Sequence, residues 1–573
     1  MPSAQRTANG EGSRRAVLPL LVTTAVAIVL AVFKGWADPF GLATDMERLS
    51  ANVFNTINSP LYGKQWRVNL DGANHRSRYG QSNIVILLID EAFVREVGPD
   101  WPIDLRHYRR MLRKLVDAGA KVVFVDVFFV ANRPGRDKQI ASLYEYAKGL
   151  IQASRCGAES CAETKSGMGT EILFASTFQN PESAVTIDEH GGEIVVSPPA
   201  TALAQIASEP TAYDLWQQVG PNDYDTAAWA IYKAWCRRTR ECDTAALDEP
   251  TPDPMYLHWG YAPNQIMTEE QALGGDVCQK QAATLLRRVA QSTRVFARNL
   301  LRGFYERGLP GSGAADAELQ SGLCPYTSQI KLQLFNHLTE GDLKALFADN
   351  VVLIGTHLEY YPDHHWSPVH GHVPGVFWHA MAVDNLIEFG SGYVRAEPGE
   401  LNRYLETASL MALFVLQALL TWFVLRREAR DGPGTVADAR LDLLHGLMII
   451  CVVSAMVLWI AGIKRGAPGN WVGLAILLFL INQRPILALP RACWNALPTA
   501  VIEPPALRLV IGPVLWLVYV VLLLLAAYAL FTLPHALLLA GELDHETINY
   551  TFLGVYVAII AFCIWKITSR SLR

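Results

Sequence analysis

Acidic side chains stand directly after two long apolar runs of this chain. The run Ile84–Ile89 ends in Asp90, and the predicted strand Lys121–Val125, which is apolar after its first residue, ends in Asp126. Continuous apolar runs are typical of strands buried on both faces of a parallel sheet, and such sheets bind ligands beyond the carboxyl ends of their strands. The two aspartates are therefore candidate ligand-binding residues, and we expect them at the ends of adjacent strands.

A third acidic group follows a later apolar run. Asp363 and His364 come a few residues after the run Val351–Gly355, so they can approach the same crevice. Carboxylates with an imidazole suit a divalent metal, and the metal-ligand candidates are Asp90, Asp126, Asp363 and His364. Further histidines nearby are His357, His365, His370, His372 and His379, the last being a packed or capping group by its place at a helix start. The alternative for the aspartates is structural, because strand-end aspartates often cap the next helix.

Tryptophans near these groups are candidates for lining a ligand pocket. Trp101, Trp366 and Trp378 have apolar rings with an N–H group, which suits pockets of mixed polarity, and core packing is the alternative. No Ser, Cys or Lys stands in a context that marks a catalytic nucleophile, and there is no G-x-S-x-G motif. We therefore expect no catalytic residue and no cofactor, and a protein that is not an enzyme.

The elements that position these residues alternate between strands and helices. Asp104–Ala118 has apolar residues at helical spacing, and Gly119 follows it as a helix-ending residue. A second helix at Asp137–Ala153 and a third strand at Glu171–Ser176 complete a β-α-β-α-β order, which predicts a parallel sheet with right-handed crossovers. The later elements are a helix at 340–347, a strand at 351–355 and a helix at 374–389.

Cysteine usage predicts disulfides in the middle of the chain. Of nine cysteines, the middle region holds six, an even number that permits three bridges in an oxidising compartment. Close spacing indicates the bridges Cys156–Cys161 and Cys236–Cys242, which leaves Cys278 with Cys324. Zinc is the alternative for the close pairs, but no histidine lies near either. Residues from about 236 to 324 are interpreted as a helical, disulfide-bearing insertion.

Six hydrophobic stretches predict an integral membrane protein. They cover residues 16–34, 404–425, 441–463, 468–483, 509–531 and 549–566. About 20 apolar residues cross a bilayer as a helix, and 468–483 is short enough that it either spans or re-enters. Flanking arginines and lysines place residues 1–15 and the tail 567–573 in the cytoplasm. The predicted fold is thus an α/β periplasmic domain at 37–400 and an α-helical transmembrane bundle at 404–566.

Ordered motifs stand at both ends of the middle region. They are I-V-I-L-L-I-D-E at 84–91, G-P-D-W-P at 98–102, D-A-G-A-K-V-V-F-V-D-V-F-F at 117–129, N-V-V-L-I-G-T at 350–356, Asp363, P-G-V at 374–376 and H-A at 379–380. Together they resemble the CHASE2 domain, an extracytoplasmic sensor module of bacterial receptors. The resemblance covers about residues 40–395 and implies flanking membrane helices. The family commonly shows W-P-W-P-R where this chain has W-P-I-D-L, so no role is carried over to Arg106.

The resemblance and the topology together lead to three hypotheses about function. CHASE2 receptors usually continue into a kinase or cyclase, whereas this chain ends a few residues after its last predicted span, so we expect no catalytic output domain. The first hypothesis is a multi-pass sensor or accessory subunit of the bacterial inner membrane that reads a periplasmic ligand or envelope state. It would pass the signal to a separate membrane or cytoplasmic partner.

The alternatives are a structural scaffold of an envelope assembly and a periplasmic metal-dependent enzyme. The lipid bilayer is a partner in each case, and a homo-oligomer is open in all three. The net charge of −5 gives no sign of nucleic-acid binding.

Overall fold

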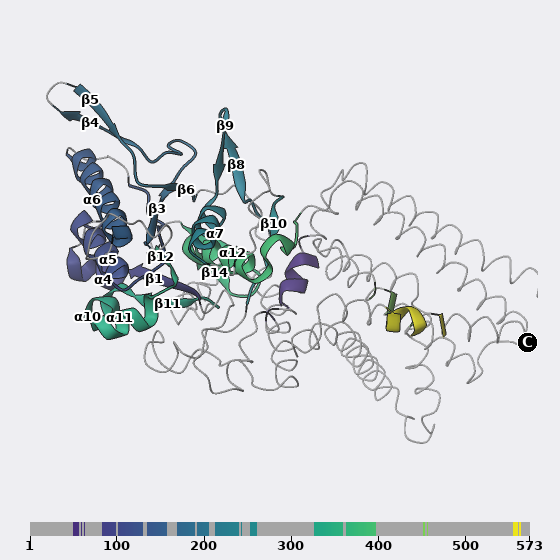
Figure 1. The fold of residues 1–573 in the computed structure, drawn as a ribbon. Coiled ribbons are helices and arrows are strands. Elements are labelled where there is room, and N and C mark those ends of the chain that lie inside the picture. The colour runs from purple at the N-terminus through teal and green to yellow at the C-terminus, as the bar shows by residue number, and fades with distance from the viewer. Residues whose placement is uncertain are drawn as a thin grey trace, which may run out of the picture. The chain divides into compact units, whose positions relative to one another are not determined.

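The computed structural model describes most of the elements of the middle region (Figure 1). The described residues are 48, 50–56, 59, 62, 83–98, 101–129, 135–156, 169–189, 192–204, 212–239, 242, 253–260, 326–358, 363–396, 448, 451, 452, 455, 554–559, 561 and 562. The chain divides into two compact units, Val53–Glu397 and a unit of Met1–Asn52 with Pro398–Arg573. The first unit lies within the domain predicted at residues 37–400.

A six-stranded parallel sheet forms the centre of the Val53–Glu397 unit. Its strands are β1 (Ile84–Asp90), β2 (Val122–Val125), β3 (Glu171–Ser176), β6 (Thr201–Leu203), β11 (Ser328–Lys331) and β12 (Val351–His357). They stand in the order β11-β1-β12-β2-β3-β6, and every neighbouring pair is parallel. The sheet confirms the predicted α/β class with a parallel core.

Strand β12 lies between β1 and β2, although it comes much later in the chain. On one side Leu87 of β1 is opposite Ile354, and on the other Ile354 is opposite Val125 of β2. The expectation that Asp90 and Asp126 follow adjacent strands is therefore wrong. A whole strand separates the two aspartates, so they face different surroundings.

Helices cover both faces of the sheet (Figure 1). They are α4 (Glu91–Val97), α5 (Leu105–Asp117), α6 (Arg136–Cys156), α7 (Ala227–Arg238), α10 (Leu332–His337), α11 (Glu340–Phe347) and α12 (Gly375–Phe389), which a short 3-10 turn, η4 (Gly390–Gly392), follows. The alternate residues Ile84, Ile86 and Leu88 of β1 pack in one core with α7 and α12. Their neighbours Val85, Leu87 and Ile89 pack in a second core with α5 and α6. Burial on both faces explains why the strand sequences are continuously apolar.

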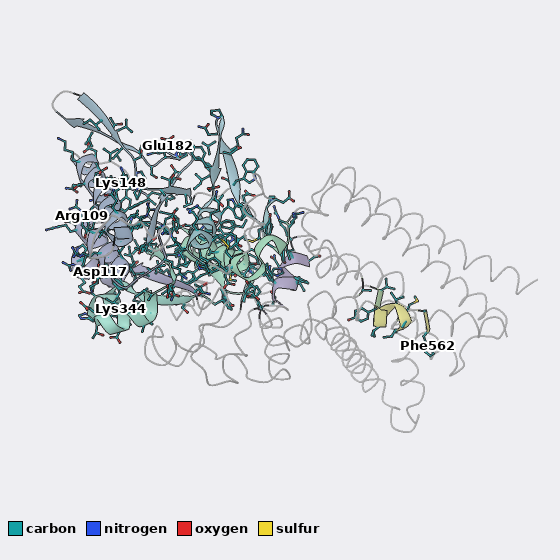
Figure 2. The ribbon with its side chains drawn as sticks, viewed as in Figure 1. Arg109, Asp117, Lys148, Glu182, Lys344 and Phe562 are labelled. Carbon is teal, nitrogen blue, oxygen red and sulfur yellow. A yellow bond between two sulfur atoms is a disulfide. The ribbon has the colours of Figure 1, made fainter. Side chains whose placement is uncertain are left out.

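Helix α5 shows how local sequence sets an element's bounds and buried face. The Asp104 side chain caps its first turn by accepting from the Arg106 backbone N–H at 2.9 Å. Its buried residues are Leu105, Tyr108, Met111, Leu112 and Leu115, which recur at helical spacing. Gly119, with a φ of +84°, follows the last turn, as predicted. Charged residues such as Arg109 of α5 and Lys148 of α6 lie on the outer side of these helices (Figure 2).

Antiparallel hairpins extend from this α/β core. They are β4 (Val185–Glu189) with β5 (Gly192–Val196), β8 (Trp216–Val219) with β9 (Asn222–Asp225), and β13 (His364–Ser367) with β14 (Gly371–Pro374). The short strands β7 (Ala212–Tyr213) and β10 (Met255–Tyr256) also pair antiparallel, but they are far apart in the chain and form no hairpin. The β13–β14 hairpin leads directly into α12, and it therefore fixes where that helix begins over the sheet.

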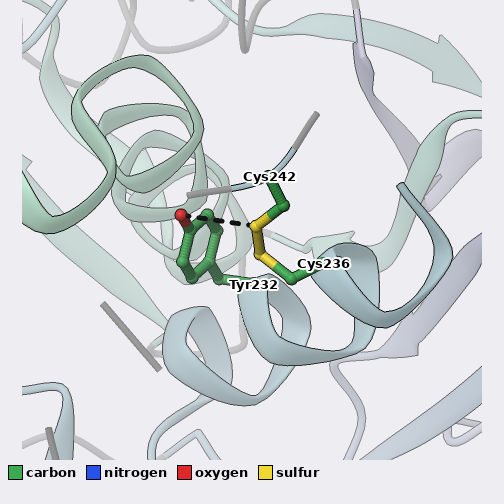
Figure 3. Close-up of a disulfide and its surroundings, with 3 residues drawn as sticks. All are labelled: Tyr232, Cys236 and Cys242. Atoms are coloured by element: carbon green, nitrogen blue, oxygen red, sulfur yellow. Dashed lines mark hydrogen bonds between the residues drawn. A yellow bond between two sulfur atoms is a disulfide. The ribbon is translucent and has the colours of Figure 1, made fainter. Parts of the chain in front are cut away.

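One predicted disulfide is present in the described part of the chain. Cys236 and Cys242 are bonded, with their Cα atoms 5.2 Å apart, and the Tyr232 hydroxyl lies 3.6 Å from Cys242 Sγ (Figure 3). Cys161, Cys278 and Cys324 lie outside the described residues, as does the side chain of Cys156. The bridges Cys156–Cys161 and Cys278–Cys324 therefore stay predictions.

Part of the predicted insertion at about 236–324 belongs to the core. Cys236 lies in α7 and is buried. Residues 253–260 contribute the buried side chains of Met255, Tyr256, Leu257 and Trp259. Most of the remaining positions up to residue 324 lie outside the described residues.

Within the described residues, no helix combines the length and the hydropathy that crossing a bilayer requires. The six predicted spans fall almost entirely outside those residues, apart from isolated positions such as Met448 and the segment 554–559. The transmembrane bundle therefore stays a prediction.

Candidate functional site

A pocket of about 360 Å³ lies at the carboxyl ends of β2, β3, β6 and β12. Its lining consists of two carboxyl groups, two imidazoles, two hydroxyls and apolar side chains: Asp126, Asp363, His365, His379, Thr177, Thr356, Trp101, Val127, Phe128 and Ala204. The volume is at the lower end of the range of small-molecule sites. Ligand sites of open parallel sheets lie at this end of the strands.

Asp126 is the most buried acidic group of the pocket. It directly follows β2, and its backbone N–H still donates to the carbonyl of Ile354 at 2.8 Å, which holds the residue against β12. Its side chain is only 6% exposed. The Oδ2 atom is buried and has no hydrogen-bond partner, and burial followed by the nearby charge of Asp363 raises the pKa of this carboxyl well above its usual value.

Asp363 faces the same pocket from the segment before β13. Its backbone carbonyl accepts from the N–H of Gly375 at 3.0 Å, which ties it to the start of α12. A Cβ atom at position 375 would overlap the Asp363 carboxyl group, so a larger residue there would displace this carboxyl group from its present position. Burial raises the pKa of Asp363, and the His365 imidazole, with Nε2 3.8 Å from Oδ1, acts in the opposite direction.

His379 points from the second turn of α12 towards Asp126. Its Nδ1 lies 2.8 Å from the hydroxyl of Tyr213, and this hydroxyl also accepts the backbone N–H of Ala228 at 3.0 Å. The hydroxyl hydrogen of Tyr213 is thus available to Nδ1, which assigns the imidazole hydrogen to Nε2. Nε2 is 3.9 Å from Asp126 Oδ2, a distance beyond a direct hydrogen bond.

The two imidazoles of the pocket are neutral at pH 7. Burial lowers the pKa of His379 to about 3, with the nearby charge of His365 acting in the same direction. Burial also lowers the pKa of His365, whose ring packs against Trp378 with the ring centroids 4.3 Å apart. The site therefore combines two carboxyl groups with two uncharged imidazoles.

Asp90 has a different environment at the end of β1. Its Oδ1 accepts the backbone N–H of Phe93 at 3.0 Å, which makes it the N-cap of α4. Its Oδ2 is 3.3 Å from Lys331 Nζ, supplied by the neighbouring strand β11. Asp90 is not among the residues lining the pocket. Asp90 therefore has the structural role that the sequence left open as the alternative, namely capping the helix that follows its strand.

The other predicted site residues divide between the pocket and its surroundings. Trp101 and Asp363 line the pocket together with Asp126. His364 lies instead beside His357, at the end of β12 opposite Asp90, with the ring centroids 6.0 Å apart. Trp366 is 39% exposed and is not one of the lining residues. Ligand binding by any of these residues stays a prediction.

No group of three or more His, Cys, Asp or Glu side chains within the described part of the chain is arranged to hold a metal ion. The four predicted metal-ligand candidates all belong to that part. Asp90 lies away from Asp126 because β12 separates their strands, and the His364 ring lies beside His357 and is not among the residues lining the pocket. The pocket therefore offers two carboxylates at most from the predicted set.

Sequence reasoning missed several residues of the site. Tyr213 lies in the short strand β7, and Ala204 directly follows the short strand β6. The sequence around each carries no ligand-binding pattern. His379, predicted as a packed or capping group, is buried against Tyr213 and also lines the pocket. A signal for it existed in the H-A motif at 379–380.

Comparison with protein families gives a match over most of the chain. A family model of the CHASE2 domain matches residues 27–424, which includes part of the hydrophobic stretches at 16–34 and 404–425. The chain belongs to the CHASE2 family. CHASE2 domains are extracellular sensor modules, typically of membrane proteins. Neither the curated proteins nor the solved structures gave a match.

The CHASE2 motifs of this chain converge on the pocket. Trp101, Asp126, Thr356, Asp363 and His379 each stand in a different motif, and all five line it. The motif glycines serve the same site, because a Cβ at Gly355 would overlap Val376 of α12, as one at Gly375 would overlap Asp363. The close approach of α12 to β12 thus depends on glycine at position 355, and the approach of Asp363 to the start of α12 on glycine at position 375.

Proposed function

We propose that this CHASE2 protein is an inner-membrane sensor or accessory subunit that binds a periplasmic ligand in the Asp126–Asp363 pocket and relays the bound state to a separate partner protein. The observation that carries the proposal is the pocket itself, in which four residues from separate motifs line the same cavity as the buried Asp126 carboxyl group, whose Oδ2 has no hydrogen-bond partner. An unpaired buried polar group is costly, so its retention calls for a functional explanation.

Helix α12 supports a relay, because it reaches from the pocket to other parts of the domain. His379 lines the pocket, and Asp384 and Asn385 follow about one and a half turns later. Asp384 Oδ2 accepts from the Tyr62 hydroxyl at 2.5 Å. Asn385 bonds both backbone groups of His258, accepting from its N–H at 3.0 Å and donating to its carbonyl at 2.9 Å.

These contacts involve the segments by which the chain enters and leaves the domain. Tyr62 follows the first predicted span, and His258 belongs to the segment 253–260. That segment is bonded to residues before the second predicted span, since the Tyr393 hydroxyl donates to the carbonyl of Asp253 and the N–H of Ala396 to that of Pro254. A ligand that changes the position of α12 would act on both segments, provided that it binds one arrangement better than the other.

The test compares partner capture by the full chain and by a chain lacking residues 84–395. Both are purified in a mild detergent from the native membrane, and the co-purifying proteins are identified. A relay through the membrane segments predicts that the shortened chain still inserts and retains the partner, while it no longer responds to the ligand. Loss of the partner with the domain would show that the domain itself is the docking surface, and the relay would be wrong.

A scaffold is the second candidate, and one observation favours it. The β4–β5 hairpin exposes two large apolar side chains, Ile194 at 44% and Val195 at 64%. Exposed apolar groups on a hairpin are common at contact surfaces between proteins. Replacing both residues with threonine would release a scaffold partner, whereas a sensor that acts through α12 would keep it.

A further inference from the structure

We infer that the pocket of this CHASE2 domain binds a small organic cation, whose ammonium or guanidinium group lies between the carboxylates of Asp126 and Asp363. The inference rests on the proposed sensor function and names the chemical class of its ligand. It follows from the charge balance of the pocket, from the burial of Asp126, and from the size and aromatic lining of the cavity.

The charge balance of the site is incomplete without a cation. Among the lining residues that the structure describes, two are aspartates and none is a lysine or an arginine. Asp126 Oδ2 has no hydrogen-bond partner, although the side chain is almost fully removed from solvent. A buried carboxylate is stable only when a positive charge or several hydrogen bonds compensate it.

The histidines of the pocket do not supply the missing positive charge. His379 Nδ1 is occupied by the Tyr213 hydroxyl, and Nε2 is 3.9 Å from Asp126 Oδ2. Burial keeps the pKa of this imidazole at about 3, and it also lowers the pKa of His365. Both rings are neutral at pH 7, so neither histidine supplies the counter-charge, and a bound cation would supply it next to the unpaired Oδ2 of Asp126.

The cavity fits an organic cation better than a metal ion or a neutral polyol. Its volume of about 360 Å³ suits a small molecule, and Trp101 and Phe128 offer aromatic faces of the kind that bind ammonium groups. Among the described residues, no three potential ligands are grouped to hold a metal ion. A polyol would donate hydrogen bonds but would leave the charge of two carboxylates uncompensated.

The test measures binding to the full chain purified in a mild detergent. The probes are 1,4-diaminobutane and (4-aminobutyl)guanidine, and 1,4-butanediol serves as an uncharged control of the same length. Thermal unfolding and calorimetry are recorded for wild type, for Asp126→Asn and for the matched control Asp90→Asn. A ligand that binds only the folded state raises the unfolding temperature as its concentration exceeds the dissociation constant.

The inference predicts that both cations bind to wild type and the diol does not. Asp126→Asn should weaken cation binding by roughly tenfold or more, because it removes one charge of the pair, while Asp90→Asn should bind like wild type. Asp126→Asn is expected to melt at or above the wild-type temperature, so lost binding is not lost folding.

Two results would overturn the inference in different ways. Absence of binding by either cation at millimolar concentration would remove the ligand class. Equal binding of the diol, sensitive to Asp126→Asn, would show a neutral ligand and leave the sensor function intact. The relay through the membrane segments fails separately, through loss of the partner from the chain that lacks residues 84–395.

Discussion

Asp90 and Asp126 both follow an apolar strand in the sequence, but the structure surrounds their carboxyl groups differently. Each stands at the end of an apolar strand of the central sheet, and each is 9% exposed. Asp90 caps α4 through the Phe93 N–H and contacts Lys331. Asp126 has one oxygen without any hydrogen-bond partner and faces a pocket that contains a second carboxyl group. Equal burial therefore does not mean equal compensation of charge.

The difference arises from the chain segment after each strand and from the elements beside it. Helix α4 begins immediately after Asp90, so its first N–H groups are available to the carboxylate. The chain after Asp126 continues through residues 127–129 without forming a helix. Strand β11 brings Lys331 beside Asp90, whereas the neighbours of Asp126 bring His379 and Asp363. A strand end becomes a candidate ligand site when its acidic group is left uncompensated.

The largest effect is expected for Gly355→Ala in β12, the strand between the two aspartates. The new Cβ would overlap Val376 and force α12 away from the sheet. We expect a loss of about 1–3 kcal/mol in the free energy of unfolding and a disturbed Asp126 pocket, because overpacking strains a close contact. Chemical denaturation of the full chain measures it.

Gly149→Ala is the matched control. Gly149 lies in α6 with open space around the position of a Cβ, so alanine there should stabilise by up to about 1 kcal/mol through helix propensity. If the two variants changed stability in the same direction, the packing of α12 on β12 would not control the pocket.

Asp90→Ala should have the next largest effect. Loss of the N-cap of α4 costs about 0.5–2 kcal/mol, and the contact with the half-exposed Lys331 adds little. Asp90→Asn keeps a capping oxygen and should change stability by less than about 0.5 kcal/mol. Equal losses in both variants, measured by denaturant titration, would mean that charge rather than capping accounts for Asp90.

Asp126→Asn should stabilise the unliganded protein by about 1 kcal/mol at pH 7. The variant removes a buried charge without a compensating partner and keeps the shape of the side chain. Thermal unfolding measured without ligand should show a higher midpoint for this variant than for wild type, and no such gain for Asp90→Asn. A drop in the midpoint would show that the Asp126 carboxylate is already compensated.

The smallest effect is the pH dependence of the stability that Asp126→Asn gains over wild type. Burial raises the pKa of Asp126 in the folded protein above its unfolded value, so the folded state binds more protons between the two values. Wild type therefore gains stability relative to Asp126→Asn as the pH falls through the raised pKa. The difference in unfolding free energy between the two proteins should shrink as the pH falls from 7, and it should vanish below about pH 4, near the unfolded pKa of an aspartate.

Asp363, His379 and His365 are present in both proteins, so only the part of their titration that depends on the Asp126 charge remains in the comparison. Unfolding midpoints recorded from pH 4 to pH 8 test the prediction. A constant difference across this range would show that the Asp126 carboxyl is not perturbed by burial.

Much of the fold was predictable because its signals are local. The apolar runs at 84–89 and 121–125 form strands buried on both faces, and the spacing of Leu105, Tyr108 and Leu115 gives the buried face of α5. The close pair Cys236 and Cys242 forms the expected bridge. Of the candidate site, the sequence indicated Trp101, Asp126 and Asp363 as pocket residues, and all three line one cavity. The strands, the buried helix face and the bridge depend on side-chain type and short spacing alone, whereas the convergence of the three pocket residues also depends on the strand order.

The sequence by itself thus determined the strands, the main helices, the family and which acidic groups stand at strand ends. Only the tertiary structure decided that β12 lies between β1 and β2. It also decided that Lys331 contacts Asp90, and that the Tyr213 hydroxyl bonds His379 beside Asp126. Strand order depends on pairing between segments far apart in the chain, and such pairing leaves no periodic pattern in either segment. The compensation of a buried charge is therefore set by distant neighbours, which local sequence does not specify.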